Sequence, residues 1–440
     1  MKFLIDIAHR PLVRNVAKVA TGNIAGNALN FIAVGLITVS LDALPLGLFV
    51  SLQAAMLFIA QFSDFGLNTT MIKYYRDMES EGSPVDAEAL LRRMLWLRLA
   101  IAGLFAGTCI VFARPICGLW LKDPDAVGLF RLICVGALGS SVWMFCQASM
   151  QARQQFGWYA ILTSGNHLVR LILVGVLVFM HRLNVSTAVY VIIAVPFVGA
   201  LGGALLWPPD FWKARMDPAE MQRQTSRIWG MTKWIFLSTI TCSLIMRLDI
   251  FLLRGMTNEG SVEVGILGAA NNFAQAFPLI TMAISTVLLP KIAATRERAE
   301  MLRIVRIFAR AAPLLMVGVG LAIVAAHLFF PWIRGGEYEQ SVWVFDLLVI
   351  GFSISVVVNP LSFFCLAFER PQWLTWMNLS QLILNVGIDV VLIPTLGALA
   401  AGVSTLSVRL FALIYLAFAF GRLLKMADRV TDSESPTARL

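Results

Sequence analysis

Polar side chains recur at helical spacing inside long apolar segments of this 440-residue chain. Residues three or four positions apart share one face of a helix, so each set forms a polar stripe. The four stripes are Asn23, Asn27 and Asn30; Gln61, Asp64 and Asn68; Thr163, Asn166 and Arg170; and Asn378, Gln381, Asn385 and Asp389. Amides bind hydroxyl groups and guanidinium groups bind phosphates, so these stripes favour non-covalent recognition. Polar side chains are unfavourable in contact with lipid tails, and we therefore expect these faces to point to the interior of the helix bundle.

Basic side chains also favour recognition of a substrate, because an arginine near the middle of a membrane normally faces a partner or a water-filled cavity. Arg170 and Arg409 each lie 12 residues into an apolar segment, near mid-depth at about 1.5 Å per residue. Arg247 lies toward the outer leaflet and Lys233 toward the inner one. Arg98 is close enough to the end of its segment for its side chain to reach the interface. An anionic substrate would be attracted at every depth.

Acidic side chains at depth are fewer. Asp64 lies near the inner end of its segment, where Gly66 allows a bend. Asp249 and Asp389 lie toward the outer side, and Asp346 is barely inside its segment. Ion pairing with the arginines is one interpretation, and gating or coupling to protons or sodium ions is the other. The amides also have two interpretations, substrate binding and helix packing. Packing is a common role, because hydrogen bonds between helices are frequent and contribute only about 0.6 to 2 kcal/mol.

The candidate residues therefore form two sets. The candidate substrate-binding residues are Arg170, Arg409, Arg247, Lys233, Asn23, Asn27, Asn271, Asn272, Gln381 and Asn385. The candidate gating or coupling residues are Asp64, Asp249 and Asp389. The six cysteines are scattered without a CxxC motif and the four histidines are far apart, so we expect neither a metal nor another cofactor. We also expect no enzymatic activity, because the soluble segments carry no phosphate cradle, nucleophile elbow or acid pair.

The segments that must position these residues are long enough to cross a membrane. The chain is 58% hydrophobic and 14% charged, whereas soluble domains are much more polar. The predicted spans are residues 16–40, 46–72, 93–113, 127–150, 158–180, 187–207, 229–253, 262–289, 304–330, 341–367, 373–393 and 397–421. The sequence therefore predicts an all-α polytopic membrane protein with twelve transmembrane helices in two six-helix lobes.

The two halves of the chain look like copies of one another. Leu46-Gly47-Leu48 opens the second predicted span and Val264-Gly265-Ile266 opens the eighth, an offset of 218 positions. Each glycine is followed 26 residues later by a lysine. Six spans per copy start both copies on the same side, which indicates parallel repeats. The predicted parts are an N-terminal lobe (1–207), a cytoplasmic linker (208–228), a C-terminal lobe (229–424) and a cytoplasmic tail (425–440).

The distribution of basic residues predicts the orientation. One side of the predicted membrane holds 24 lysines and arginines at its ends and loops, and the opposite side holds 6. Such an excess places both termini in the cytoplasm. The net charge of +9 would suggest a nucleic-acid partner in a soluble protein, but in a membrane protein the distribution of the basic residues is more informative than their total, and we expect no nucleic-acid partner. We expect no short cleavable signal before the first span, because residues 1–18 are basic and mixed.

Short motifs in several spans resemble those of a known transporter family. They are Leu46-Gly47-Leu48-Phe49, Ser63-Asp64-Phe65-Gly66-Leu67-Asn68, Asp249-Ile250-Phe251-Leu252-Leu253, Val264-Gly265, Ala269-Ala270 and Leu288-Leu289-Pro290-Lys291. Over Ala17 to Leu423 the chain resembles the polysaccharide exporters, the Wzx-type flippases for lipid-linked oligosaccharides. These belong to the multidrug/oligosaccharidyl-lipid/polysaccharide superfamily. The chain departs from the family after the two opening glycines, where a tyrosine is frequent and this chain has Leu48 and Ile266.

The resemblance implies a V-shaped pair of lobes around a central lumen that opens alternately to cytoplasm and periplasm. It implies an undecaprenyl-pyrophosphate-linked oligosaccharide as substrate, an O-antigen or exopolysaccharide repeat unit flipped to the periplasmic leaflet of a bacterial inner membrane. The partners would be this substrate, the membrane lipids and the polymerase or export machinery of the polysaccharide. The stripes agree with this substrate, because pyrophosphate is anionic and sugars present hydroxyl groups.

Three alternatives remain open. A cation-coupled multidrug exporter of the same superfamily would need acids or aromatic residues to hold cationic drugs, whereas basic residues outnumber acids at depth here. Lipid II flippases typically have two further spans. An O-antigen polymerase or ligase usually does its chemistry in a large periplasmic loop, and every outer loop predicted here is short.

Overall fold

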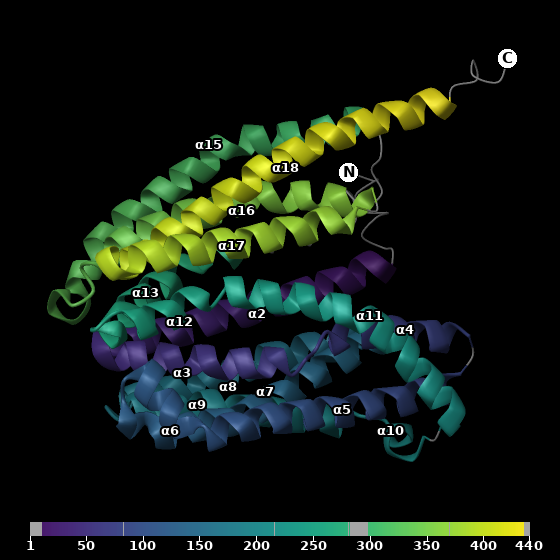
Figure 1. Ribbon diagram of the computed structural model, residues 1–440, viewed down its shortest axis with the longest axis horizontal. Helices are drawn as coiled ribbons and strands as arrows, with labels where there is room; N and C mark the ends of the chain where they lie inside the picture. Colours follow the sequence, from purple (N-terminus) through teal and green to yellow (C-terminus); the bar gives the residue numbers. More distant parts are fainter. Residues whose placement is uncertain are drawn as a thin grey trace. The chain divides into compact units, whose positions relative to one another are not determined.

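The computed structural model describes residues 11–81, 83–214, 216–279, 281, 298–368 and 370–434. This part of the chain is helical and contains no β-strand. It forms two compact units, Met1–Gly265 (unit 1) and Ile266–Leu440 (unit 2), which are described separately. Figure 1 shows the helices of each unit.

Unit 1 is a bundle of long helices joined by short turns. Its elements are α2 (Pro11–Ser40), α3 (Ala43–Phe62), α4 (Leu67–Ser80), α5 (Pro84–Val111), α6 (Ala113–Ile116), η1 (Cys117–Leu121), η2 (Pro124–Ala126), α7 (Val127–Ala152), α8 (Phe156–Phe179), α9 (Val185–Leu205), α10 (Pro209–Lys213), α11 (Pro218–Ile245) and α12 (Leu248–Met256). In this bundle α2 packs along α8, and α7 packs against α9, α5 and α3.

Local sequence explains where several of these helices begin. The α9 helix starts with a capping box: the Asn184 side chain accepts a hydrogen bond from the Thr187 amide, and the Thr187 hydroxyl accepts one from the Asn184 amide, both at 2.9 Å. The α5 helix starts with Pro84 in its first turn, where a missing amide proton costs no hydrogen bond. These caps fix the ends of spans whose stability comes mainly from the packing of their apolar faces.

Unit 2 contains α15 (Arg298–Phe329), η3 (Phe330–Gly336), α16 (Ser341–Ala367), α17 (Pro371–Leu396) and α18 (Ala398–Glu434). The α18 helix packs against α16 and α17, and α15 packs against α16 (Figure 1). A buried apolar cluster that includes Phe364, Leu416 and Leu423 holds these helices together. The remaining helix, α13 (Gly260–Ala274), begins in unit 1 and continues into unit 2.

The helices confirm the predicted all-α polytopic class. In the described part of the chain, ten helices are long and apolar enough to cross a membrane, or eleven when a bent pair of helices counts as one span. The predicted eighth span, 262–289, begins in α13 and then runs into residues 282–290, outside the described ones. The total of twelve spans therefore stays a prediction.

Two predicted spans are not single straight helices. The span predicted at 46–72 is divided into α3 and α4 by a turn at Ser63 to Gly66. The span predicted at 229–253 bends by 50° between α11 and α12. Apolar length alone predicts that a segment crosses the membrane, but it carries no information about such breaks.

The predicted linker and tail contain helical structure. Within residues 208–228 the structure has α10 and the start of α11. Arg92 donates hydrogen bonds to the carbonyl oxygens of Trp212 and Ala214, and Phe211 is fully buried, so α10 is fixed against α5. The α18 helix continues to Glu434, beyond the predicted start of the tail at residue 425. The predicted division into lobes, linker and tail stays a prediction.

Candidate functional site

The break in the second span is built by two residues with positive φ. Phe65 has φ of 50° and Gly66 has φ of 74°, and the Leu67 amide donates to the Asp64 carbonyl oxygen at 2.7 Å to close the turn. Glycine adopts this conformation without strain, whereas phenylalanine rarely does. The Phe65 ring stacks on Phe236 of α11 with ring centroids 3.9 Å apart, which stabilises the turn. The predicted bend at Gly66 is confirmed.

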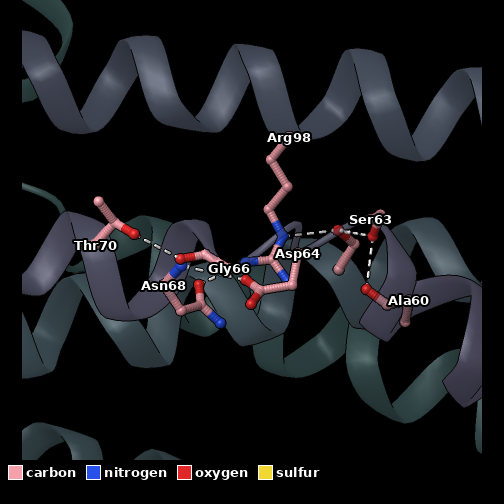
Figure 2. Close-up of polar contacts among 8 residues, drawn as sticks. Ala60, Ser63, Asp64, Gly66, Asn68, Thr70 and Arg98 are labelled. Atoms are coloured by element: carbon pink, nitrogen blue, oxygen red, sulfur yellow. Dashed lines mark hydrogen bonds and ion pairs between the residues drawn. The ribbon is translucent and has the colours of Figure 1, made fainter. Parts of the chain in front are cut away.

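An ion pair lies directly at this break (Figure 2). Nη1 of Arg98, from α5, lies 2.9 Å from Oδ1 of Asp64 and donates to Oδ1 of Asn68 at 2.6 Å. Nε of Arg98 donates to Oγ of Ser141 at 2.8 Å, and that hydroxyl contacts the Ser63 hydroxyl at 2.9 Å. Arg98 is 1% exposed and Asp64 is 5% exposed. This pair therefore joins α3, α4, α5 and α7 inside unit 1.

The expectation that the Arg98 side chain reaches the interface is wrong. The predicted span began at residue 93, but α5 begins at Pro84, so that Arg98 is the fifteenth residue of the helix. Its side chain points to the broken span and not to the helix end (Figure 2). Of the two interpretations of Asp64, ion pairing is the one that the geometry confirms.

The Arg170 side chain lies at the contact between α2 and α8. Its Nη1 donates to Oδ1 of Asn30 at 2.6 Å, and no ion pair within the described residues joins it to a carboxylate. Its Nε is buried and has no hydrogen-bond partner among the described residues. Arg170 is half-buried, and a cation held by an amide keeps most of its charge uncompensated, which makes it a candidate for binding an anion.

Other members of the α2 and α8 stripes hold helices together. The Tyr159 hydroxyl donates to Oδ1 of Asn23 at 3.2 Å, and Nδ2 of Asn166 donates to the Val195 carbonyl oxygen of α9 at 2.8 Å. A Cβ atom added at Gly22 would lie 2.5 Å from the Cβ of Ala160, so the backbones of α2 and α8 approach closely there. These contacts confirm that both stripes face inward, and they favour a packing role for Asn23 and Asn166.

The α17 stripe of unit 2 also faces inward. Asn385 donates through Nδ2 to Oγ of Ser404 on α18 at 2.7 Å. Gln381 is 4% exposed and Asp389 is fully buried. Arg409, one helical turn beyond Ser404 on α18, is half-buried. Unit 2 therefore places an arginine on a helix that contacts the polar stripe of α17.

The remaining predicted residues occupy different places. Arg247 lies in the break between α11 and α12, where its φ of −132° departs from helical values, so it does not share one continuous helical face with Ser243. Nε of Arg247 is buried without a hydrogen-bond partner among the described residues. Asp249 lies in the first turn of α12, where the helix dipole favours an acid. The Lys233 side chain lies outside the described part, and Asn27 is half-buried on α2.

Two further candidates, Asn271 and Asn272, are half-buried on α13. The described residues contain no group of three or more histidine, cysteine, aspartate and glutamate side chains that could hold a metal ion. The candidate side chains described above can form hydrogen bonds and ion pairs.

A second buried ion pair was not predicted. Arg153 binds Glu88 through two hydrogen bonds, Nε to Oε1 at 2.8 Å and Nη2 to Oε2 at 2.6 Å. The Tyr75 hydroxyl donates to the same carboxylate at 3.0 Å, and the Arg153 guanidinium lies over the Phe211 ring. This pair connects α4, α5, α7 and α10. Glu88 falls in a segment predicted as a loop, so that nothing in the sequence pattern marks it as buried.

Comparison with known proteins gives one family and one fold. The model of the family described as "Polysaccharide biosynthesis protein" matches residues 12–296. No curated protein matches the chain significantly.

Three solved structures illustrate the shared fold. An inward-facing MATE family multidrug resistance transporter of the MOP superfamily has a TM-score of 0.73 at 13% identity, covering 90% of this chain and 95% of that one. The lipid II flippase MurJ in an inward closed conformation has a TM-score of 0.73 at 12% identity, covering 94% and 93%. The Vibrio cholerae MATE transporter VcmN in its bent form has a TM-score of 0.60 at 15% identity, covering 94% and 97%.

Proposed function

Because this chain belongs to the polysaccharide biosynthesis protein family, we propose that it flips a lipid-linked oligosaccharide across the bacterial inner membrane. It is a multi-pass membrane protein with the fold of the MOP-superfamily transporters. The proposed substrate is an undecaprenyl-pyrophosphate-linked repeat unit of O-antigen or exopolysaccharide. The proposed direction is from the cytoplasmic to the periplasmic leaflet by alternating access, with both termini in the cytoplasm as the basic-residue bias predicts.

The observation that supports an anionic substrate most directly is the environment of Arg170. Its guanidinium is held by the Asn30 amide at 2.6 Å, and no described carboxylate pairs with it. An uncompensated charge inside a membrane is costly and normally marks a pathway. Pyrophosphate carries the opposite charge and offers several acceptor oxygens to a guanidinium. Cationic drugs would be repelled from the same place.

The other candidate residues have different proposed roles during the crossing of the substrate. Arg409 in unit 2 and Arg247 at the break of the seventh span would provide further contacts to the headgroup, together with Lys233. Amides such as Asn27, Asn271, Asn272 and Gln381 would bind sugar hydroxyl groups. We assign gating or coupling roles to Asp249 and Asp389, because Asp64 is already held in an ion pair with Arg98. The polyprenyl tail would stay in lipid, and polysaccharide polymerase or export machinery would receive the product.

Replacement of Arg170 and Arg409 by glutamine tests this function. Loss of a hydrogen bond to a charged group costs about 1.5 to 3 kcal/mol. If the contact acts in the slow step, export should fall by roughly ten- to a hundredfold, at about 1.4 kcal/mol per decade. The measurement is surface polysaccharide in cells whose only copy of the gene carries Arg170→Gln or Arg409→Gln, with the membrane level of each variant determined in parallel.

The matched control is Arg93→Gln. Arg93 is exposed and lies on the same helix as Arg98, so its replacement should change export little. Arg98→Gln is not a suitable control, because Arg98 is buried in an ion pair. Normal export by both test variants at normal membrane levels would contradict the proposed role. Altered resistance to cationic drugs without altered polysaccharide would favour the multidrug-exporter alternative.

A further inference from the structure

The α15 helix of unit 2 has one buried side and one exposed side. Successive residues of a helix are about 100° apart around its axis, so their numbers give the side on which they lie. Met301, Ile304 and Ala326 lie on one side and are at most 5% exposed. Met301 and Ile304 belong to the buried apolar cluster that α15 shares with α16 and α18. This side therefore holds the helix in unit 2.

The exposed side carries two kinds of side chain, one after the other along the helix. All of them lie within a sector of about 80°, roughly opposite the buried side. Arginines come first, at the N-terminal end of the helix, and apolar residues follow. The apolar side chains are each more than half exposed. We call this surface the α15 stripe, and it consists of Arg303, Arg306, Arg310, Leu314, Val317, Leu321, Val324 and Leu328.

The arginines of the α15 stripe have no counter-charge among the described side chains. No ion pair or side-chain hydrogen bond between described residues involves Arg303, Arg306 or Arg310. Glu300 is the one acidic residue of α15, and it lies outside the stripe. Three like charges at spacings of three and four residues repel one another, which destabilises a helix. A ligand with negative charge would remove this repulsion.

The depths of the arginines bring their guanidinium groups to a similar level. The apolar segment is predicted to begin at residue 304, so Arg310 lies about 9 Å inside it at about 1.5 Å per residue. Side chains of a helix tilt toward its N-terminus, and a long arginine side chain at this depth reaches the interface. The guanidinium groups of Arg306 and Arg310 should therefore end near the level of Arg303, where lipid headgroups lie.

The α15 stripe matches the chemistry of an anionic lipid. A phosphate group accepts paired hydrogen bonds from a guanidinium, and acyl chains pack on leucine and valine side chains. One leaflet of the hydrocarbon core is about 15 Å thick, or about ten residues of helix, so a chain anchored at Arg310 would extend as far as Leu321. The basic-residue bias predicts that the arginines face the cytoplasm, where anionic lipids attract basic clusters.

We propose that the α15 stripe binds an anionic phospholipid of the cytoplasmic leaflet, with its phosphate on the three arginines and an acyl chain along the apolar residues that follow. This inference goes beyond the proposed function, because it does not depend on which molecule is transported. The bound headgroup offsets the repulsion among the arginines in the first turns of α15. The lipid composition of the membrane therefore acts directly on unit 2.

Fluorescence quenching by brominated lipids tests this surface in the full chain, with its six native cysteines replaced by alanine. Leu314→Cys places a fluorophore next to the arginines, and Ile383→Cys on α17 is the matched control. Both residues lie ten positions beyond the start of their predicted spans, 304–330 and 373–393, and they are 78% and 66% exposed. The α17 helix has no basic residue. Each protein is reconstituted in vesicles of phosphatidylcholine and phosphatidylglycerol, in which one of the two lipids carries brominated acyl chains.

At residue 314, phosphatidylglycerol should be preferred to phosphatidylcholine by about fivefold or more, because one arginine near an anionic surface contributes about that factor. At residue 383 the two lipids should quench in proportion to their amounts. The triple variant Arg303→Gln, Arg306→Gln and Arg310→Gln should lose the preference at residue 314. Arg370→Gln, which removes an exposed arginine outside the stripe, should keep it. Quenching at residue 383 in every variant is the check that unit 2 is inserted.

Equal preference at the two positions would overturn the proposal, and so would a preference at residue 314 that survives the loss of the three arginines. Absence of quenching by either lipid at residue 314, with normal quenching at residue 383, would mean that protein covers the stripe, which also contradicts the proposal. A polyprenyl phosphate tested in place of phosphatidylglycerol distinguishes the other lipid source. Preference for the polyprenyl phosphate alone would assign the stripe to the transported lipid and not to phospholipid.

Discussion

Two arginines of unit 1 have opposite surroundings. Arg98 lies beside a carboxylate, with an amide and a hydroxyl as further partners, at a break in the second span. Arg170 has a hydrogen bond to one amide, at the contact between two unbroken helices. Arg98 is buried and Arg170 is half-buried, but only Arg98 is neutralised by its neighbours. The difference separates a charge that holds the fold together from a charge that is available to a ligand.

The energetics of the two regions should differ accordingly. Removing one member of a buried ion pair leaves the other without a counter-charge, which costs about 3 to 5 kcal/mol, whereas removing both can be nearly neutral. A single hydrogen bond to a charged group contributes about 1.5 to 3 kcal/mol. Changes in the Arg98 region should therefore act mainly on stability, and changes in the Arg170 region mainly on transport.

The largest expected effect is that of Asp64→Leu. It leaves Arg98 buried without a carboxylate, and the free energy of unfolding should fall by about 3 to 5 kcal/mol. The double variant Asp64→Leu with Arg98→Met should recover most of that loss. Unfolding of the purified proteins in detergent measures both. A single variant as stable as the native protein, or a double variant no more stable than the single one, would contradict a structural role for the pair.

A smaller effect is expected for Gly66→Ala at the same break. Alanine would have to adopt φ of 74°, and its Cβ would lie 2.9 Å from the Phe236 amide nitrogen. Strain of this kind costs about 1 to 3 kcal/mol. The matched control is Gly103→Ala, where an added Cβ meets nothing within 4 Å of a helical position. This control should be neutral or slightly stabilising, so equal unfolding temperatures for the two variants would argue against strain at the break.

The smallest expected effect on stability, and the sharpest test of the comparison, comes from Asn30→Asp. It replaces the amide that contacts Arg170 at 2.6 Å by a carboxylate, so that Arg170 gains an ion-pair partner as Arg98 has in Asp64. Export should fall by about tenfold, equivalent to about 1.4 kcal/mol, while the unfolding temperature should not fall. Asn30→Leu should do the reverse, with lower stability and retained export. Unchanged export in Asn30→Asp would mean that the charge of Arg170 is not used in transport.

Much of the fold could be predicted because helical periodicity and apolar length are local properties of a sequence. The inward direction of the stripes follows from spacing alone, and Asn30, Asn166 and Asn385 all contact neighbouring helices. The bend at Gly66 could be predicted because glycine tolerates positive φ. Phe65 beside it could not, because a bulky residue adopts that conformation only when tertiary packing, here a stacked ring, stabilises it.

The pairing of charges could not be predicted from spacing. Asp64 and Arg98 lie on different helices, and their contact depends on how far α5 extends beyond the apolar part of its sequence. Glu88 could not be predicted as buried for the same reason, because it precedes the apolar segment of α5 and its partners, Tyr75 and Arg153, lie on or next to other helices. Depth estimated from apolar length is therefore unreliable near helix ends.

The Asp64–Arg98 pair also affects the order of events during synthesis. Arg98 is 34 residues farther along the chain than Asp64, and at about 5 to 20 residues per second a ribosome needs roughly 2 to 7 seconds to add them. During this interval the nascent second span contains a carboxylate whose counter-charge has not yet been made. Insertion of an aspartate into a span is unfavourable, by up to about 2.5 to 3.5 kcal/mol when it lies at the centre. The second and third spans should therefore leave the insertion machinery together, with Asp64 held in its polar environment until Arg98 arrives.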